Sequence, residues 1–179
     1  MACGSSSDVG IFLADQYYSG GETYNNTNTI DVSQIIDNPP PAELFNNERY
    51  GEMSYTIPNF TSGNSYIVTL YFAETYLTSS GERLFDVSIN GATVLSGFDI
   101  YASAGGQNIA IARSFTVAAD SSGQIAIQFT AGTENPKING ISIQPGIQLP
   151  IQPLHQLLRR HLLLETVMYP LIRRIPPRA

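Results

Sequence analysis

The chain has 179 residues, only 13% of them charged, with 15 Gly, 10 Tyr and no Trp; this composition is typical of a β-sandwich or barrel and argues against a helical bundle. A single cysteine, Cys3, excludes an internal disulfide and a thiolate metal cluster. Residues 1–145 hold 14 Asp and Glu against four Arg and Lys, a net charge of −10 that repels phosphate backbones and argues against nucleic acid as a partner.

The start of the chain, MACGSSSDVG, has neither a basic nor an apolar segment of the kind that a secretory signal needs. No stretch of about 18 apolar residues follows anywhere, so no membrane-spanning segment is expected. From residue 9 to 144 the chain alternates short apolar runs with turn signals, which predicts strands joined by loops. The first long loop is expected over residues 19–47, which are rich in Asn and Thr and contain three prolines at 39–41.

The clearest strand is SYIVTLYFAE (65–74), which is apolar on both faces and therefore predicts a central strand. The next run, RLFDVSI (83–89), places Phe85, Val87 and Ile89 on one face. It leads into Asn90 and Gly91, two residues that tolerate positive φ, and the returning ATVLSGF predicts a hairpin with a type I′ turn.

Further strands are expected at IARSFTV (111–117), IAIQFTA (125–131) and INGISI (138–143), after a Gly-rich crossing at residues 101–108. Alternation in the second of these places Ile125, Ile127 and Phe129 on the inward face. Strands at this spacing, with no segment of helical period among them, predict an all-β fold: an antiparallel, jelly-roll-like β-sandwich.

Residues 146–179 differ in composition and charge from the rest of the chain. They carry five Arg against one Glu, and both histidines, His155 and His161. We expect a domain at 5–145 and, at 146–179, a short non-β tail that is a linker or a non-native extension. The stretch LHQLLRRHLLLETV between Pro153 and Pro170 could form a short amphipathic helix. The alternative interpretation of such a basic amphipathic helix is an element that contacts a membrane or a partner.

The absence of histidine before residue 155 excludes a Ser-His-Asp or Cys-His arrangement and an imidazole metal site within the predicted sandwich. Carboxylates that could pair for glycoside hydrolysis occur near strand ends: Glu74, Glu82, Asp86, Asp99 and Glu134. Fourteen acids in one domain produce such pairs by chance, so no catalytic residue is predicted. The loops also lack D-x-D-x-D spacing, and no metal or cofactor is predicted, although Asp99 and the Asn- and Asp-rich loops could hold a structural Ca²⁺.

Tyrosine provides the positive signal for function. Four tyrosines fall at predicted loops or strand ends beside polar residues: Tyr24, Tyr50, Tyr76 and Tyr101. A tyrosine ring offers a flat face to the C–H side of a sugar and a hydroxyl group to its hydroxyls, with few rotors to immobilise. Each tyrosine alone could simply cap its own sheet edge, but four together favour a binding surface.

Several motifs resemble the malectin domain, a family of carbohydrate-binding modules, and the bacterial type fits better than the animal one. They are ADQYYSGG (14–21), NERYG (47–51), VTLYFAETYLTSSGERLFDVSINGATVL (68–95), FDIYASAGG (98–106) and ENPKINGISI (134–143). The resemblance covers about residues 5–145. The strand that the family has at its start is reduced here to residues 2–4, so we expect one edge strand to be missing.

The resemblance implies a jelly-roll-like sandwich that binds carbohydrate without cutting it. Motif by motif, it assigns the binding site to Tyr50 of E-R-Y, to Tyr76 and Leu77 after F-A-E, and to Glu134 and Asn135 before P-K. Tyr24 corresponds to an upstream loop tyrosine of the family. Because Leu77 stands where the family has Phe and Glu134 where it has Asp, the animal glycan specificity is not expected to carry over. A glucan-type oligo- or polysaccharide is the expected ligand.

The resemblance also implies a parent protein that is multidomain, glycan-active and extracellular or at the cell surface. Two other functions stay open on the sequence. One is a structural or adhesion sandwich without a live sugar site, and the other is a glycoside-acting enzyme, which the missing histidines disfavour.

Overall fold

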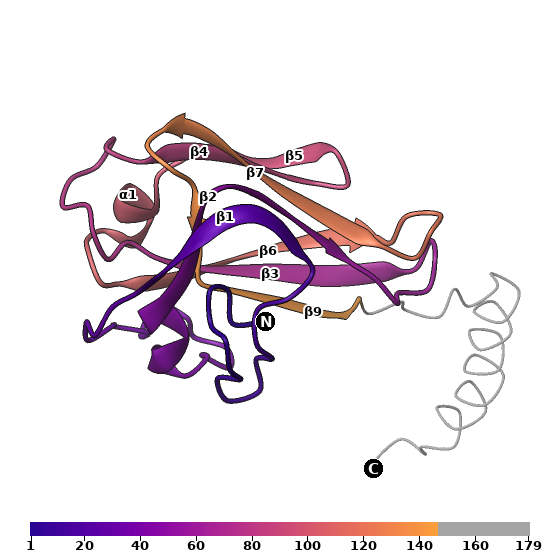
Figure 1. The fold of residues 1–179 in the computed structure, drawn as a ribbon, viewed down its shortest axis with the longest axis horizontal. Coiled ribbons are helices and arrows are strands. Elements are labelled where there is room, and N and C mark those ends of the chain that lie inside the picture. The colour runs from indigo at the N-terminus through magenta and orange to yellow at the C-terminus, as the bar shows by residue number, and fades with distance from the viewer. Residues whose placement is uncertain (147–179) are drawn as a thin grey trace, which may run out of the picture. The chain divides into compact units, whose positions relative to one another are not determined.

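In the computed structural model, two antiparallel sheets face each other (Figure 1). The larger sheet has the order β1-β2-β7-β4-β5, and the two-residue strand β8 (Lys137–Ile138) pairs with β2 beside this path. Its strands are β1 (Tyr18–Asn25), β2 (Asn47–Ile57), β7 (Ile125–Thr133), β4 (Leu84–Ile89) and β5 (Ala92–Phe98). The smaller sheet has the order β6-β3-β9, from β6 (Ala110–Ala118), β3 (Ser65–Ala73) and β9 (Gly140–Pro145). The all-β antiparallel sandwich is confirmed.

The structure describes residues 1–146, which lie within one compact unit, Met1–Ile147. The predicted tail and its possible helix fall almost entirely on residues 147–179, outside the described part. Two short helices complete the unit, a 3₁₀ helix η1 (Ala42–Asn46) and α1 (Ile100–Ala104). Neither helix in the described part is long and apolar enough to cross a membrane.

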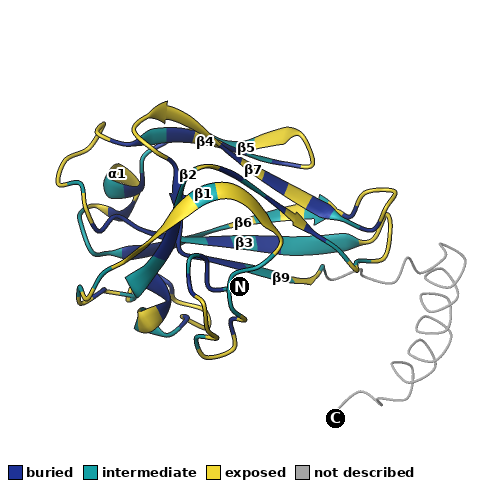
Figure 2. Cartoon of the chain, in the orientation of Figure 1, coloured by how far each residue is buried: buried dark blue, intermediate teal, exposed yellow. Residues whose placement is uncertain are grey.

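The core forms between the sheets because alternate residues of each strand point inward (Figure 2). Phe85, Val87 and Ile89 of β4 are buried, as predicted from their alternation. So are Ile125, Ile127 and Phe129 of β7. Between the sheets, the rings of Phe72, Phe85 and Phe98 pack in tilted and edge-on contacts with centroids 5.1–6.1 Å apart.

The β4–β5 hairpin turns where the sequence predicts. Asn90 has φ 51° and Gly91 has φ 79°, the pair of left-handed residues that a type I′ turn requires. The Asn90 side chain also donates to Ala118 O and accepts from Ala126 N, both at 2.8 Å, which fixes the turn against the neighbouring chain.

Several segments differ from the prediction. No strand is predicted where β2 lies, and the predicted strand 138–143 is divided between β8 and β9, which belong to different sheets.

Two further differences concern β1 and α1. Strand β1 lies inside the predicted loop 19–47 and is exposed along almost its whole length, so its residues show no inward–outward alternation (Figure 2). Helix α1 lies inside the predicted crossing 101–108, where the Asp99 carboxylate accepts from Ala102 N at 2.9 Å and Gly105 ends the helix with φ 79°. Pairing with β2 sets the conformation of β1, and end caps set α1. Neither cause leaves a hydrophobic period in the sequence.

The start of the chain packs into the fold without forming a regular strand. Ala2 and Cys3 are fully buried, and isolated bridges join Ala2 to Ala14 and to Gly140. Cys3 N also donates to Asn139 O at 3.0 Å. Among the described residues β1 is the first regular strand.

Candidate carbohydrate-binding site

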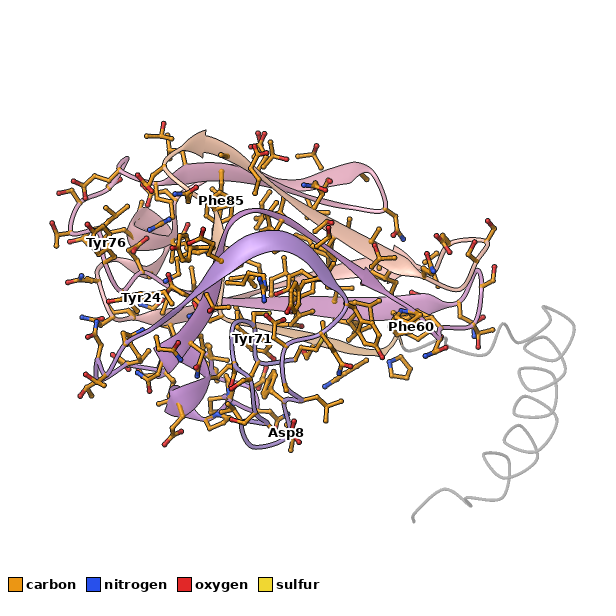
Figure 3. The ribbon with its side chains drawn as sticks, viewed as in Figure 1. Asp8, Tyr24, Phe60, Tyr71, Tyr76 and Phe85 are labelled. Atoms are coloured by element: carbon orange, nitrogen blue, oxygen red, sulfur yellow. The ribbon has the colours of Figure 1, made fainter. Side chains whose placement is uncertain are left out.

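A pocket of about 210 Å³ opens at one end of the larger sheet. Because antiparallel neighbours run in opposite directions, the ends of β1 and β7 meet the starts of β2 and β4 at this end of the sandwich. The loop that follows β3 reaches the same place, and Figure 3 shows Tyr24 and Tyr76 together there. The pocket is lined by Tyr24, Glu48, Tyr50, Tyr76, Arg83, Glu134 and Asn135.

The structure brings five of the six predicted site residues into this pocket: Tyr24, Tyr50, Tyr76, Glu134 and Asn135. Leu77 is half-buried and does not line it. The fourth tyrosine of the sequence pattern, Tyr101, lies on α1 and does not line it either. Two lining residues, Glu48 and Arg83, were not predicted.

Strand pairing places Tyr24 and Tyr50 on one side of the pocket. In the β1–β2 register Tyr24 is opposite Glu48 and Glu22 is opposite Tyr50, so all four side chains point to the same face. The Tyr50 hydroxyl donates to Glu22 Oε2 at 2.9 Å. This hydrogen bond, together with the charge of Glu22, raises the pKa of Tyr50 above its ordinary value, because both favour the protonated hydroxyl that donates to Glu22.

On the other side of the pocket, Glu74 holds the loop that carries Tyr76. Its Oε1 accepts the backbone N–H groups of Tyr76 and Leu77, both at 3.1 Å, and its Oε2 lies 2.7 Å from Arg83 Nε. The side chain of Tyr76 is left 72% exposed at the loop edge. Tyr76 and Leu77 can follow β3 without a Gly or Asn turn because the buried Glu74 carboxylate accepts their backbone N–H groups.

Arg83 links the loops on two sides of the pocket. Besides its ion pair with Glu74, its Nη1 donates to the backbone oxygen of Asn135. Glu134, which precedes Asn135, has φ 60°, and the Asn135 amide donates to Glu134 Oε1 at 3.0 Å. The Tyr76 loop and residues 134–135 are therefore held in one arrangement by a single guanidinium group.

A second buried ion pair lies behind the pocket. Lys137 is 0% exposed, and its ammonium group donates to the Glu48 carboxylate and, at 3.2 Å, to Thr75 Oγ1. Thr75 Oγ1 in turn donates to Glu48 Oε2 at 3.1 Å. Burial lowers the pKa of Lys137, and the negative charges of Glu48 and Glu74 partly offset this effect. The backbone of Lys137 pairs with Tyr50, which places residues 134–135 beside that ring.

The other candidate carboxylates act as backbone acceptors instead of gathering at a site. Glu82 accepts from Thr78 N and Ser79 N, and Asp86 accepts from Gly97 N at 2.7 Å. Asp99 caps α1 and binds Ser80 and Gly81. Within residues 1–146, no group of three or more His, Cys, Asp or Glu is arranged to hold a metal ion.

The Glu74 carboxylate makes the stability of the domain depend on pH. Burial opposes its ionisation, but the hydrogen bond from Arg83 and the charges of Lys137 and Arg83 outweigh burial, so the pKa of Glu74 lies below its usual value of 4.5. A depressed pKa contributes stability that is present above pH 4.5 and lost as the pH falls through the lower value in the folded protein.

We therefore expect Glu74→Gln to lower the free energy of unfolding near pH 6, and the gap between the variant and the unaltered protein to narrow steadily below pH 4.5. Urea unfolding followed between pH 6 and pH 2.5 measures this gap. A gap that stays constant over the whole range would contradict the assignment of Glu74 as an ionised partner of Arg83.

A β-sandwich with exposed tyrosines and hydrogen-bonding groups around a loop-end pocket is the architecture of a carbohydrate-binding domain. The family model of the malectin domain matches residues 2–141, and the chain belongs to this family. The family resemblance of the sequence is thus confirmed, while the bacterial type stays a prediction. Malectin domains bind carbohydrate.

Curated relatives come from animals and plants. The chain is 32% identical to Malectin-B of Xenopus laevis over 126 residues, covering 63% of this chain and 45% of that protein. It is 30% identical to a kinesin-like protein of Oryza sativa subsp. japonica, covering 76% of this chain and 13% of that protein. The chain thus spans less than half the length of these relatives.

Among solved structures, the ectodomain of ANX2 from Arabidopsis thaliana superposes with a TM-score of 0.64 at 18% identity, over 71% of this chain and 41% of that one. A calcium-binding mutant of beta-glucuronidase 2 from Bacteroides uniformis gives 0.57 at 20% identity, over 72% of this chain and 14% of that one. At these identities the similarity concerns the fold.

Proposed function

We propose that the pocket binds a short stretch or an end of a neutral glycan, of the glucan type, without cutting it. The observation that carries this proposal is the convergence of Tyr24, Tyr50 and Tyr76 from three separate segments on one pocket. Tyr24 is 47% and Tyr76 72% exposed, so both rings have faces available to a ligand.

The groups around these rings suit sugar hydroxyls. The Glu134 carboxylate accepts hydrogen bonds, the Asn135 amide donates and accepts them, and both side chains are exposed. Behind them, the ion pairs of Glu74 with Arg83 and of Glu48 with Lys137 hold the loops before any ligand arrives. A site organised in advance loses less conformational entropy on binding, which favours affinity for a small ligand.

Hydrolysis would require two carboxyl groups free to move protons across the pocket. The carboxylates that line it are Glu48 and Glu134. Glu48 is buried and committed to Lys137 and Thr75, so its protonation would break a buried ion pair. This arrangement favours binding over catalysis. A structural or adhesion sandwich would leave the exposed tyrosines without a role, and this is why we prefer sugar binding to that alternative.

A glycan array probed with the full chain tests the proposal, followed by calorimetry on the best ligand. We expect Tyr76→Ala and Tyr50→Ala each to weaken binding by about 1–3 kcal/mol, which is roughly tenfold or more in Kd, with little change in thermal stability. Tyr101→Ala is the matched control, because Tyr101 lies outside the pocket, and it should bind like the unaltered chain.

Two outcomes would overturn the proposal: no glycan on the array is bound, or both pocket variants keep full affinity. Release of a shortened glycan during the incubation would instead support the glycoside-acting alternative.

We further propose that the domain belongs to a longer, glycan-active protein and is displayed outside the cell. In support, a relative from Arabidopsis thaliana, 28% identical over 162 residues, is by its name a probable LRR receptor-like kinase, and the match covers 16% of it. Accessibility of the domain to protease added to intact source cells tests this location, since an intracellular domain would resist until lysis.

A further inference from the structure

A second and larger hollow, of about 990 Å³, lies over the outer face of the sheet β6-β3-β9. It shares no lining residue with the tyrosine pocket. One wall is the turn at residues 10–12 and the other is the segment 34–41. The floor is formed mainly by residues that point away from the core, Thr69 and Tyr71 of β3, Ala112 and Ser114 of β6, and Ser142 and Gln144 of β9. We call this hollow the groove.

The floor of the groove carries a row of hydroxyl groups that strand register lines up. Thr69 of β3 is opposite Ser114 of β6 on one side and Ser142 of β9 on the other. Thr69 Oγ1 lies 2.8 Å from Ser114 Oγ, and the Tyr71 hydroxyl lies 3.4 Å from Ser142 Oγ. Each hydroxyl can donate and accept, so the row can adapt to either role in a ligand.

The groove is nearly free of charge, in contrast to the rest of the domain. Its lining includes one acid, Asp37, and one base, Arg113. Arg113 is engaged elsewhere, since its Nη1 donates to Ala112 O at 2.9 Å and its guanidinium lies 5.6 Å from the centre of the Phe98 ring. Residues 1–145 carry a net charge of −10, so the groove is a neutral strip on an acidic domain.

Each wall of the groove carries one exposed isoleucine side chain. Ile11 is 91% exposed at the tip of a turn closed by hydrogen bonds between Val9 and Phe12 at 2.8 and 2.9 Å, and the Phe12 ring packs edge-on against Tyr71 at 5.5 Å. On the opposite wall, Ile36 is 87% exposed, while Gln34 Nε2 donates to Ala104 O at 2.7 Å.

We propose that the groove is a second carbohydrate-binding site, which takes an extended stretch of a neutral polysaccharide and acts independently of the tyrosine pocket. A glycan chain presents hydroxyls along the edges of its rings and C–H groups on their faces. The hydroxyl row matches the edges, and Ile11 and Ile36 offer apolar contact to the faces. Within residues 1–146, Arg113 is the one cation that lines the groove and it is engaged elsewhere, so an acidic polymer would meet an acidic domain without a partner for its charge.

The test uses the full chain labelled with ¹⁵N and carrying Tyr50→Ala and Tyr76→Ala, so that the tyrosine pocket is disabled. Four linear probes are titrated in separate experiments: cellohexaose, laminarihexaose, maltohexaose and mannohexaose. For at least one probe we expect amide shifts concentrated at residues 69–71, 112–114 and 142–144. Adding Ser114→Lys, which places a long charged side chain on the floor, should weaken that binding about tenfold or more.

Thr116→Lys is the matched control. Thr116 is exposed on the same strand and face as Ser114, opposite Ile67, but lies outside the groove, so its substitution should leave binding within about twofold. The proposal is overturned if none of the four probes shifts these amides or if the two lysine variants behave alike. It is also overturned if hexagalacturonate, titrated in the same way, shifts these amides at a lower concentration than every neutral probe. Failure of the proposal for the tyrosine pocket is a separate result. In that case the unaltered chain and the chain with Tyr50→Ala and Tyr76→Ala would bind sugar with equal affinity.

Discussion

Replacing Lys137 by Met should lower the free energy of unfolding by about 3–5 kcal/mol at neutral pH. The ammonium group of Lys137 is fully buried and is the cationic partner of the buried Glu48 carboxylate. Methionine fills a similar volume but leaves that carboxylate with the hydroxyl of Thr75 alone. The cost is large because a nearly buried carboxylate that has lost its partner keeps little hydration and must either stay uncompensated or take up a proton at neutral pH. Urea unfolding at pH 7 measures it.

The double variant Glu48→Gln with Lys137→Met separates this charge effect from a packing effect. It removes both charges and keeps an amide that can still accept from Thr75, so most of the lost stability should return. A double variant no more stable than Lys137→Met alone would show that the loss does not come from an unpaired Glu48 charge. A single variant within about 1 kcal/mol of the unaltered chain would show that the ion pair contributes little.

Replacing Arg83 by Met should cost roughly 3 kcal/mol or more of stability and also abolish the sugar binding proposed for the tyrosine pocket. The stability is lost because Glu74 is buried and takes its closest charged hydrogen bond, at 2.7 Å, from Arg83. Binding is lost because, within residues 1–146, the hydrogen bonds of Arg83 are those that join Glu74, which holds the Tyr76 loop, to residue 135. Calorimetry below the melting temperature, with circular dichroism to verify the fold, separates the two effects.

Arg113→Met is the matched control for this variant. Arg113 is half-buried, and the contacts recorded for its guanidinium are the Ala112 carbonyl and the Phe98 ring. Its replacement should cost about 1 kcal/mol and leave the tyrosine pocket intact. If Arg83→Met bound sugar as Arg113→Met does, the two loops would be held in place without the guanidinium.

Much of the sandwich could be predicted because its inner strands alternate strongly. The runs 65–74, 83–89 and 125–131 correspond to β3, β4 and β7 within a few residues. Strand β1 could not be found this way, since it is exposed on both faces and owes its conformation to pairing with β2. The division of strands between two sheets could not be predicted from the sequence either, because it depends on contacts between segments far apart in the chain.

The tyrosines of the pocket were accessible to sequence reasoning because their type, their loop positions and their motifs agree. Glu48, Arg83 and Lys137 were missed, since the role of each depends on a partner that only the fold supplies. The scarcity of basic residues in an acidic domain was a signal in the sequence that could have pointed to these ion pairs. Residues 1–145 contain four Arg and Lys, and three of them, Arg49, Arg83 and Lys137, are buried in ion pairs.

The ion pair between Glu48 and Lys137 joins residues 89 positions apart. Contacts of such long range close large loops, and they form late and slowly compared with the β4–β5 hairpin, whose strands are neighbours in the chain. During synthesis, a chain that has emerged only as far as β7 would therefore already hold the three tyrosines but no finished pocket behind them. The sugar binding proposed for the tyrosine pocket then requires a chain that has emerged at least as far as Lys137, whose ion pair with Glu48 lies behind the pocket.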